Sequence, residues 1–143
     1  MIKRKYYCLL IVFIVVISCS NHENKYSNAL IGEWQVEKLL HGNKDYSLDE
    51  TYILSFSLPS ELWIHSLNHN KKISVSSKFE VSNKSDSYFM DITSNDKNIN
   101  GNYNIYIDTI QENQESYFIR LRLDSEKTYI HAIRQKLKRD WPD

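Results

Sequence analysis

Alternation of apolar and polar residues with a period of two is the feature that most constrains how this chain folds. The clearest run places Ile73, Val75, Phe79 and Val81 in one phase, with Ser77 between them, and lysine, serine and glutamate in the other phase. Successive side chains of an extended strand leave opposite faces of the sheet, whereas a helix repeats every 3.6 residues. This run therefore predicts a strand with one face buried and the other exposed to solvent.

The same pattern recurs along the rest of the chain. Clear runs cover residues 52–58, 103–107 and 117–123, and weaker ones cover 32–40, 61–67, 87–94 and 127–136. Segments rich in Gly, Pro, Asn, Asp and Ser separate them, as turns require. These connections are too short for the crossovers that parallel strands need. We therefore predict an all-β fold, an antiparallel eight-stranded up-and-down barrel, with a two-sheet sandwich as the alternative.

The first residues have a different character from the rest of the chain. Lys3, Arg4 and Lys5 precede an unbroken run of ten apolar residues, Cys8–Ile17. A basic head followed by a short apolar stretch is typical of an export signal. A membrane-spanning helix needs about 20 apolar residues, so this run is too short to span. We expect residues 1–18 to be a signal peptide that is removed.

The apolar run ends in Val16-Ile17-Ser18-Cys19, which resembles the lipobox of bacterial lipoproteins. The resemblance implies cleavage after Ser18, a diacylglyceryl group on the Cys19 thiol and acylation of the new amino terminus. It divides the chain into a signal peptide (1–18), a polar lipidated tether (19–28), the folded domain (29–137) and a basic or polar tail (138–143). The expected partner of Cys19 is therefore a membrane.

Composition excludes several classes of function for the exported part. Removing residues 1–18, which hold three basic residues and no acidic ones, leaves 125 residues with a formal charge of −3. Such a balance argues against nucleic-acid binding. Cys8 and Cys19 are the two cysteines of the sequence, so the domain has no thiol for a disulfide or a zinc site. The sequence indicates no cofactor and no metal site, and the domain must be stable through its core.

The start of the domain carries a second resemblance. Asn28–Val36 is a short apolar turn followed by Gly32-x-Trp34, which resembles the opening of the lipocalin family, and especially the small lipocalin-like domains of bacterial lipoproteins. The resemblance implies that Leu30 and Ile31 close the bottom of the barrel and that Trp34 plugs this end from inside. It also implies that an arginine of the last strand, here Arg134, packs over the Trp34 ring.

Two further features bear on where the protein is located. Ser20 follows the lipobox cysteine and no acidic run follows it, which resembles lipoproteins of the outer membrane that face the periplasm. The abundance of Asn, Ile, Lys, Tyr and Ser resembles proteins of Bacteroidota. We therefore expect a lipid-anchored protein of the cell envelope.

The sequence contains no pattern typical of catalysis. The phosphate-binding loop, the His-Glu-x-x-His zinc motif and the Gly-x-Ser-x-Gly nucleophile motif are all missing, and acidic pairs such as Asp49-Glu50 fall in loops. We expect no catalytic residues and no enzymatic activity. The first hypothesis is a carrier of a small apolar molecule, with a wall formed by Leu54, Phe56, Val75, Phe79, Ile105, Ile107, Ile119 and Leu121. The alternative is a protein-binding module with a filled barrel, such as an immunity protein, an inhibitor or an accessory subunit of an envelope complex.

Overall fold

The structure is a computed structural model, and it describes residues 28–68, 71–112 and 115–137. The chain divides after Leu30 into two units, and the whole sheet belongs to the second one. The expected signal peptide, most of the tether with Cys19, and the 138–143 tail lie outside the described residues. None of the helices in the described ranges has the length and apolar character needed to cross a membrane.

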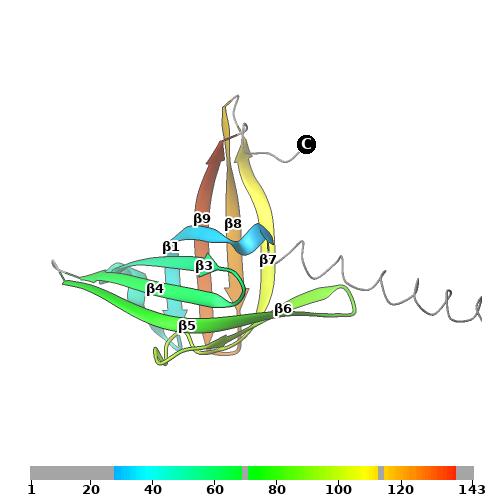
Figure 1. The fold of residues 1–143 in the computed structure, drawn as a ribbon. Helices are drawn as coiled ribbons and strands as arrows, with labels where there is room; N and C mark the ends of the chain where they lie inside the picture. Colours follow the sequence, from blue (N-terminus) through cyan, green and yellow to red (C-terminus); the bar gives the residue numbers. More distant parts are fainter. Residues whose placement is uncertain (1–27, 69–70, 113–114, 138–143) are drawn as a thin grey trace, which may run out of the picture. The chain divides into compact units, whose positions relative to one another are not determined.

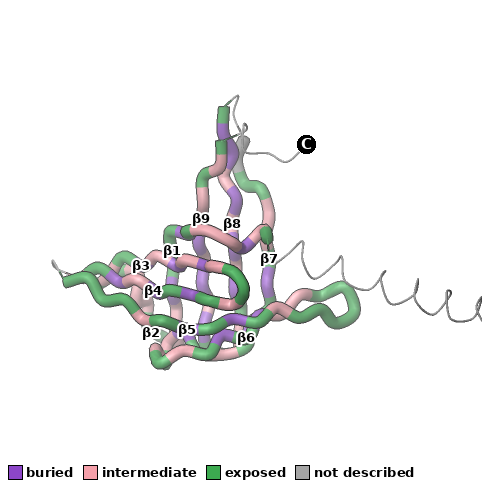
Figure 2. The backbone as a smooth tube through the Cα atoms, viewed as in Figure 1, coloured by how far each residue is buried: buried purple, intermediate pink, exposed green. Residues whose placement is uncertain are grey.

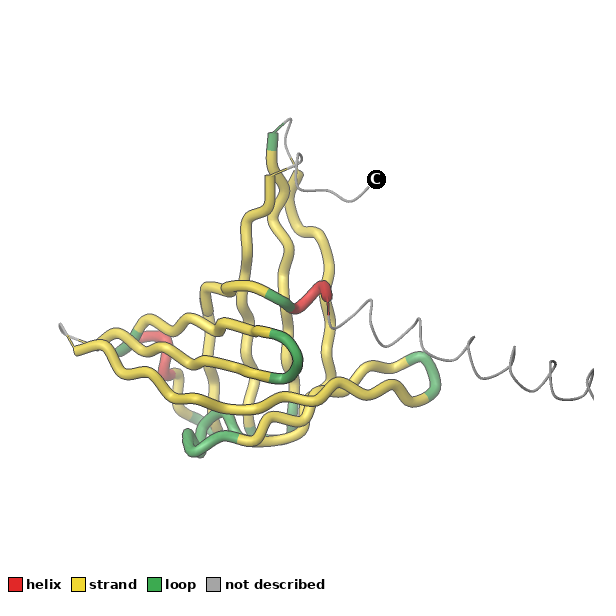
Figure 3. The backbone as a smooth tube through the Cα atoms, in the orientation of Figure 1, coloured by secondary structure: helices red, strands yellow, loops and turns green. Residues whose placement is uncertain are grey.

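Nearly all of the described chain is β-structure (Figures 1 and 3). One 3-10 helix, η1 (Tyr46–Leu48), interrupts it near the start. The strands are β1 (Gly32–His41), β2 (Lys44–Asp45), β3 (Thr51–Ser57), β4 (Glu61–Asn68), β5 (Lys71–Lys84), β6 (Ser87–Thr93), β7 (Gly101–Glu112), β8 (Ser116–Asp124) and β9 (Thr128–Leu137).

The sheet closes on itself. From β3 to β9, each strand pairs antiparallel with the next one in sequence, and β1 pairs with both β3 and β9. Eight strands thus form a closed up-and-down barrel, and the short β2 adds an extra pairing to β1 through Leu40 and His41. The barrel prediction is confirmed, and the sandwich alternative is not observed.

Apolar residues that alternate with polar ones in the sequence lie on the inner face of the barrel, and the polar residues lie on the outer face. In β3, Tyr52, Leu54 and Phe56 are buried, while the residues between them are exposed or half-buried. Figure 2 shows the same succession of buried and accessible residues along the other strands. In β5, however, Ile73 is 43% exposed and Val81 is half-buried. The reason is position. Ile73 lies near the start of β5, at the rim of the barrel. Val81 belongs to a part of the β5–β6 hairpin that extends beyond the pairing with β4.

The barrel interior is filled by its own side chains. Trp34, Tyr103, Phe56, Leu54, Leu62, Met90, Ile92 and Leu121 are among the largest fully buried residues. Phe56 and Phe79 meet edge to face, with ring centroids 5.1 Å apart. Such contacts place the core on the barrel axis between Trp34 at one end and Tyr103 toward the other.

The connection between the predicted strands 32–40 and 52–58 contains β2 and η1. The Asp45 side chain accepts a hydrogen bond from the Ser47 backbone nitrogen at 3.1 Å and so caps η1. A capping carboxylate stabilises a helical turn because it satisfies a backbone N–H that would otherwise have no partner. Tyr46 and the residues after η1 are thereby held at the end of the barrel where β1 ends.

Candidate ligand site at the barrel mouth

Most of the residues predicted to form a ligand-binding wall belong to the packed core. Two of the eight, Val75 and Ile107, are half-buried. The other six are at most 8% exposed: Leu54, Phe56, Phe79, Ile105, Ile119 and Leu121. Val75 lines a cavity at one end of the barrel, which is described below. The structure thus brings the predicted residues together, but as neighbours within a filled interior.

The residues of the Gly-x-Trp resemblance meet at the end of the barrel where β1 begins, here called the closed end. The Arg134 guanidinium lies 4.3 Å from the centroid of the fully buried Trp34 ring. One of its terminal nitrogens also donates a hydrogen bond to the Ile31 carbonyl. Burial lowers the pKa of Arg134. The Trp34 ring and the Ile31 carbonyl both hold this cation.

Gly32 allows this close approach. Its φ is +120°, a conformation that side chains rarely adopt, and a Cβ placed there would lie 2.5 Å from a terminal nitrogen of Arg134. Glycine is therefore required both by the backbone and by the arginine that crosses over it. Leu30, one residue before the barrel unit, is fully buried, and Ile31 is half-buried.

The opposite end of the barrel, here called the mouth, is covered by the loop between β6 and β7. This cap loop (residues 94–100) buries Ile99, which is 1% exposed. The Tyr103 hydroxyl donates to the Ile99 carbonyl at 2.6 Å, and the Thr128 hydroxyl donates to the Asn98 carbonyl at 3.2 Å. Within the loop, the Asp96 carboxylate accepts from the Asn98 backbone nitrogen at 2.9 Å. The cap loop is thus fixed to β7 and β9.

A cavity of about 230 Å³ lies at the mouth beside the cap loop. Its inner surface comes from three consecutive strands, its outer edge from η1 and the residue before β3, and its remaining side from the cap loop. The lining residues are Tyr46, Glu50, Tyr52, Ile64, Ser66, Ile73, Val75, Asp96 and Asn98. Isoleucine and valine form an apolar surface, and polar groups converge from the rim, which is the usual composition of a small-molecule site.

Glu50 is the best-held polar group of this cavity. Its carboxylate accepts hydrogen bonds from the Asn68 side-chain nitrogen, at 3.2 Å, and from the hydroxyls of Tyr52 and Ser66. The bond from Asn68 is the main reason that the pKa of Glu50 is below its ordinary value of 4.5. Burial and the bond to Glu50 raise the pKa of Tyr52. At neutral pH the cavity therefore contains an ionised carboxylate and a neutral phenol.

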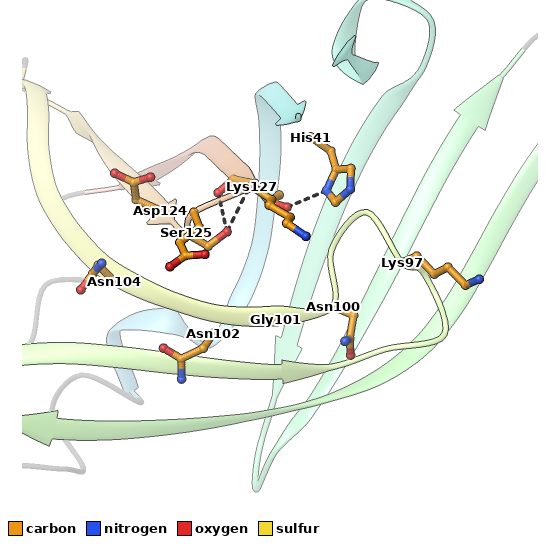
Figure 4. Close-up of a pocket in the computed structure, with 11 residues that line it drawn as sticks. His41, Lys97, Asn100, Gly101, Asn102, Asn104, Asp124, Ser125 and Lys127 are labelled. Atoms are coloured by element: carbon orange, nitrogen blue, oxygen red, sulfur yellow. Dashed lines mark hydrogen bonds between the residues drawn. The ribbon is translucent and has the colours of Figure 1, made fainter. Parts of the chain in front are cut away.

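A larger hollow of about 830 Å³ lies on the other side of the cap loop, and Figure 4 shows it in close-up. Side chains of the cap loop, β7 and the β8–β9 turn line it, including Lys97, Asn102, Asn104, Asp124 and Lys127. His41 stands at its edge, with its Nδ1 2.8 Å from the Thr128 hydroxyl. This groove is more open than the mouth cavity, and its lining residues are polar apart from Gly101, so water can satisfy their groups. We therefore consider the smaller cavity the better ligand site.

A third hollow, of about 550 Å³, lies on the outer face of the barrel around β1, β3, β8 and β9. Ile53, Phe118 and Ile133 contribute apolar surface to it, and Glu33 and Gln35 contribute polar edges. On the neighbouring strand β4, Trp63 is 39% exposed and its ring is nearly parallel to that of His65. This outer-face groove is the part of the barrel most suited to contact with another protein.

Sequence reasoning did not identify the polar residues of the mouth. Glu50 belongs to the acidic pair Asp49-Glu50, which the sequence places in a loop, yet Glu50 lines the cavity while Asp49 is exposed. Asp96 and Asn98 appear in the sequence only as turn formers. One feature of the sequence does point to Glu50. It lies directly before a predicted strand, and Tyr52, two residues later, faces inward. Among the described residues, no three His, Cys, Asp or Glu side chains gather as a metal site would require.

The comparisons with known proteins give this chain no family, since no family model matches it and no curated protein matches it in sequence.

Proposed function

We propose that this protein is a lipid-anchored, non-enzymatic protein of the bacterial cell envelope that binds a small amphipathic molecule at the mouth of its barrel. The barrel fold is compatible with such a role, and the lipobox-like sequence ending in Cys19 supports the anchor. The single observation that carries the binding proposal is the mouth cavity, where inward-facing Ile64 and Val75 meet the Glu50 carboxylate above a filled core.

The filled interior changes the ligand that we expect. Ligand pockets for drug-sized molecules typically have volumes of about 300–1,000 Å³. The mouth cavity, at about 230 Å³, is smaller than that range, so it suits one end of a molecule rather than a whole one. We therefore propose that the ligand places a small group in the mouth and leaves its remainder along the rim, where Ile73 is 43% exposed.

Native mass spectrometry of the full-length protein, released from detergent in the gas phase, tests this proposal. We expect a small-molecule adduct on the wild-type protein after incubation with an extract of the producing cells. The variant Val75→Trp fills the cavity and should lose the adduct, whereas Ser76→Trp, on the outer side of the same strand, should keep it. An adduct that survives Val75→Trp, or no adduct on any variant, would contradict a site at the mouth.

A second candidate function is a protein-binding module, and the outer-face groove favours it. Ile53, Phe118 and Ile133 are half-buried side chains on the outside of a barrel whose interior is full. A photo-crosslinking amino acid at position 133 should then give one discrete protein adduct in the producing cells. The same residue at position 82, on the exposed β5–β6 hairpin, should give none. Equal labelling at both positions would count against this function.

A further inference from the structure

The charge of the mouth cavity has one sign. Among the described residues that line it, Glu50 and Asp96 carry charge at neutral pH, and both are acidic. They reach the cavity from different segments, Glu50 from the position before β3 and Asp96 from the cap loop. Both are half-buried, and both act on the Tyr52 hydroxyl that lies among the lining residues. Two carboxylates around one partly enclosed space attract a cation more strongly there than in bulk water.

The donors around Glu50 orient the carboxylate without neutralising it. Asn68, Tyr52 and Ser66 all donate through neutral groups, so the negative charge remains after their hydrogen bonds are made. A half-buried charge is stabilised best by an opposite charge. The nearby cation on the chain is Lys44, whose positive charge contributes weakly to lowering the pKa of Glu50.

The position of Lys44 indicates the kind of cation that the rim accepts. Its ammonium lies 4.4 Å from the centroid of the Tyr46 ring, and Tyr46 lines the mouth cavity. An ammonium over a tyrosine ring is a cation–π contact, and it is favourable for alkylated ammonium groups as well. The chain thus places its own ammonium on a ring that lines the cavity, and this ammonium competes with a cationic ligand for Tyr46.

The apolar part of the lining determines what the cation is attached to. Ile64 is 2% exposed and closes the inner surface, Val75 is half-buried, and Ile73 reaches the rim. A hydrated metal ion gains nothing from such a surface, whereas an alkyl chain is removed from water by it. The cavity is therefore better suited to an organic cation than to an inorganic one.

We infer that the mouth cavity binds an organic ammonium compound, with its nitrogen near Glu50 and Asp96 and its carbon chain along Ile64, Ile73 and Val75. This inference rests on the proposed function, because it names the ligand class of the same site. Glu50 acts as the main counter-charge, and Lys44 reduces affinity by competing for Tyr46 and Glu50.

Isothermal titration of the full-length protein in a neutral detergent tests the inference with four probes of equal chain length: hexyltrimethylammonium, hexylamine, hexanol and hexanoate. We expect the two cations to bind, hexanol to bind more weakly and hexanoate not to bind. Glu50→Gln keeps an acceptor for its donors and should weaken cation binding by about tenfold. Lys44→Gln should strengthen it by about two- to fivefold. Glu80→Gln, which removes an exposed charge on the outer side of β5, should leave it unchanged.

A change in folding cannot imitate this pattern, because Lys44→Gln and Glu50→Gln are expected to act in opposite directions. If Glu50→Gln does not fold, Asp96→Asn provides a second charge removal that retains the acceptor for Asn98. If hexanol and hexanoate bind as well as the cations, and Val75→Trp abolishes the binding of all four probes, the cation preference is wrong and the mouth site is retained. Absence of binding by all four probes, together with an adduct that survives Val75→Trp, would overturn the site itself.

Discussion

Arg134 is the single residue on which the closed end of the barrel depends most. It lies over the Trp34 ring and donates to the Ile31 carbonyl, and Gly32 leaves room for it. A guanidinium is weakly hydrated and planar, so it covers an aromatic face with a smaller loss of hydration than an ammonium would suffer. This explains how a cation half-buried beside a tryptophan stabilises the structure rather than weakening it.

Replacing this cation by an apolar chain of similar length should therefore be costly. We expect Arg134→Met to lower the free energy of unfolding by about 1–3 kcal/mol, because it removes a cation–π contact and a hydrogen bond. Urea unfolding followed by tryptophan fluorescence measures this change. Lys78→Met, an exposed lysine on β5, is the control and should change little. Equal stability of the two variants would show that the Arg134–Trp34 contact contributes nothing.

Asp108 and Arg120 form an ion pair on the outer face, between β7 and β8. Arg120 Nε donates to the Asp108 carboxylate at 2.9 Å and a terminal nitrogen of Arg120 donates to the second oxygen. These bonds are the main reason that the pKa of Asp108 is below its ordinary value of 3.8. A lowered pKa in the folded state means that the contribution to stability is complete above pH 4, and that it is lost as the pH falls through the lower, folded value.

The variant Asp108→Asn tests the direction of this effect. We expect it to be less stable than the wild type at pH 7 and to approach the wild type as the pH falls through the folded pKa of Asp108, because the wild-type carboxyl is then protonated as well. Urea unfolding at a series of pH values gives the difference. Asp91→Asn, an exposed aspartate on β6, should show a smaller dependence on pH. A difference between Asp108→Asn and the wild type that stays constant from pH 7 to pH 2 would exclude the ion pair as its cause.

At the level of elements, the strands could be predicted from the sequence, and the mouth of the barrel could not. A run such as Tyr52, Leu54 and Phe56 determines its own burial, because the period of two depends only on local geometry. The cap loop is different. Ile99 reads as one apolar residue among turn formers, and its burial depends on Tyr103 and Thr128. The mouth cavity depends in the same way on contacts between Glu50 and β4, which no local pattern shows.

The hydrogen bond from Tyr103 to the cap loop gives an element-scale prediction. We expect Tyr103→Phe to reduce the free energy of unfolding by about 0.5–1.5 kcal/mol at pH 7, because the Ile99 carbonyl loses its donor. Burial raises the pKa of Tyr103 from 10.0 to about 12. A raised pKa means that this contribution is complete below pH 10 and is lost as the pH rises toward 12.

The measurement is chemical unfolding of wild type and Tyr103→Phe between pH 7 and pH 12. The wild-type curve should fall toward the Tyr103→Phe curve and then below it as the pH increases, because only the wild type has this phenol to ionise. Tyr52, whose pKa is raised further by burial, is present in both proteins, so the difference between them isolates Tyr103. Curves that stay parallel up to pH 12 would mean that the Tyr103 hydroxyl does not hold the cap loop.

For the molecule as a whole, the central property is a barrel stabilised by its own interior, in a domain without cysteine. Truncating Leu121, which is fully buried, should therefore cost about 2–5 kcal/mol through lost contacts and the cavity left behind. Ile73→Ala removes a side chain that is 43% exposed at the rim and should cost about 1 kcal/mol. Thermal or urea unfolding compares the two. Similar small losses for both variants would indicate a loosely packed interior rather than a filled one.

In the proposed function, the location of the whole molecule depends on the sulfur atom of Cys19. Each buried methylene of an acyl chain contributes about 0.8 kcal/mol to membrane binding, so several chains on Cys19 would hold the protein firmly on a bilayer. We expect Cys19→Ser to abolish incorporation of labelled fatty acid. Cys8→Ser, a matched change inside the expected signal peptide, should leave it intact. The intact mass of the wild type should correspond to a chain that begins at Cys19 and carries lipid. A wild-type mass that includes residues 1–18, or fatty acid on the Cys19→Ser chain, would contradict lipid anchoring through Cys19. The mouth cavity would then belong to a protein that is not held on the membrane through Cys19.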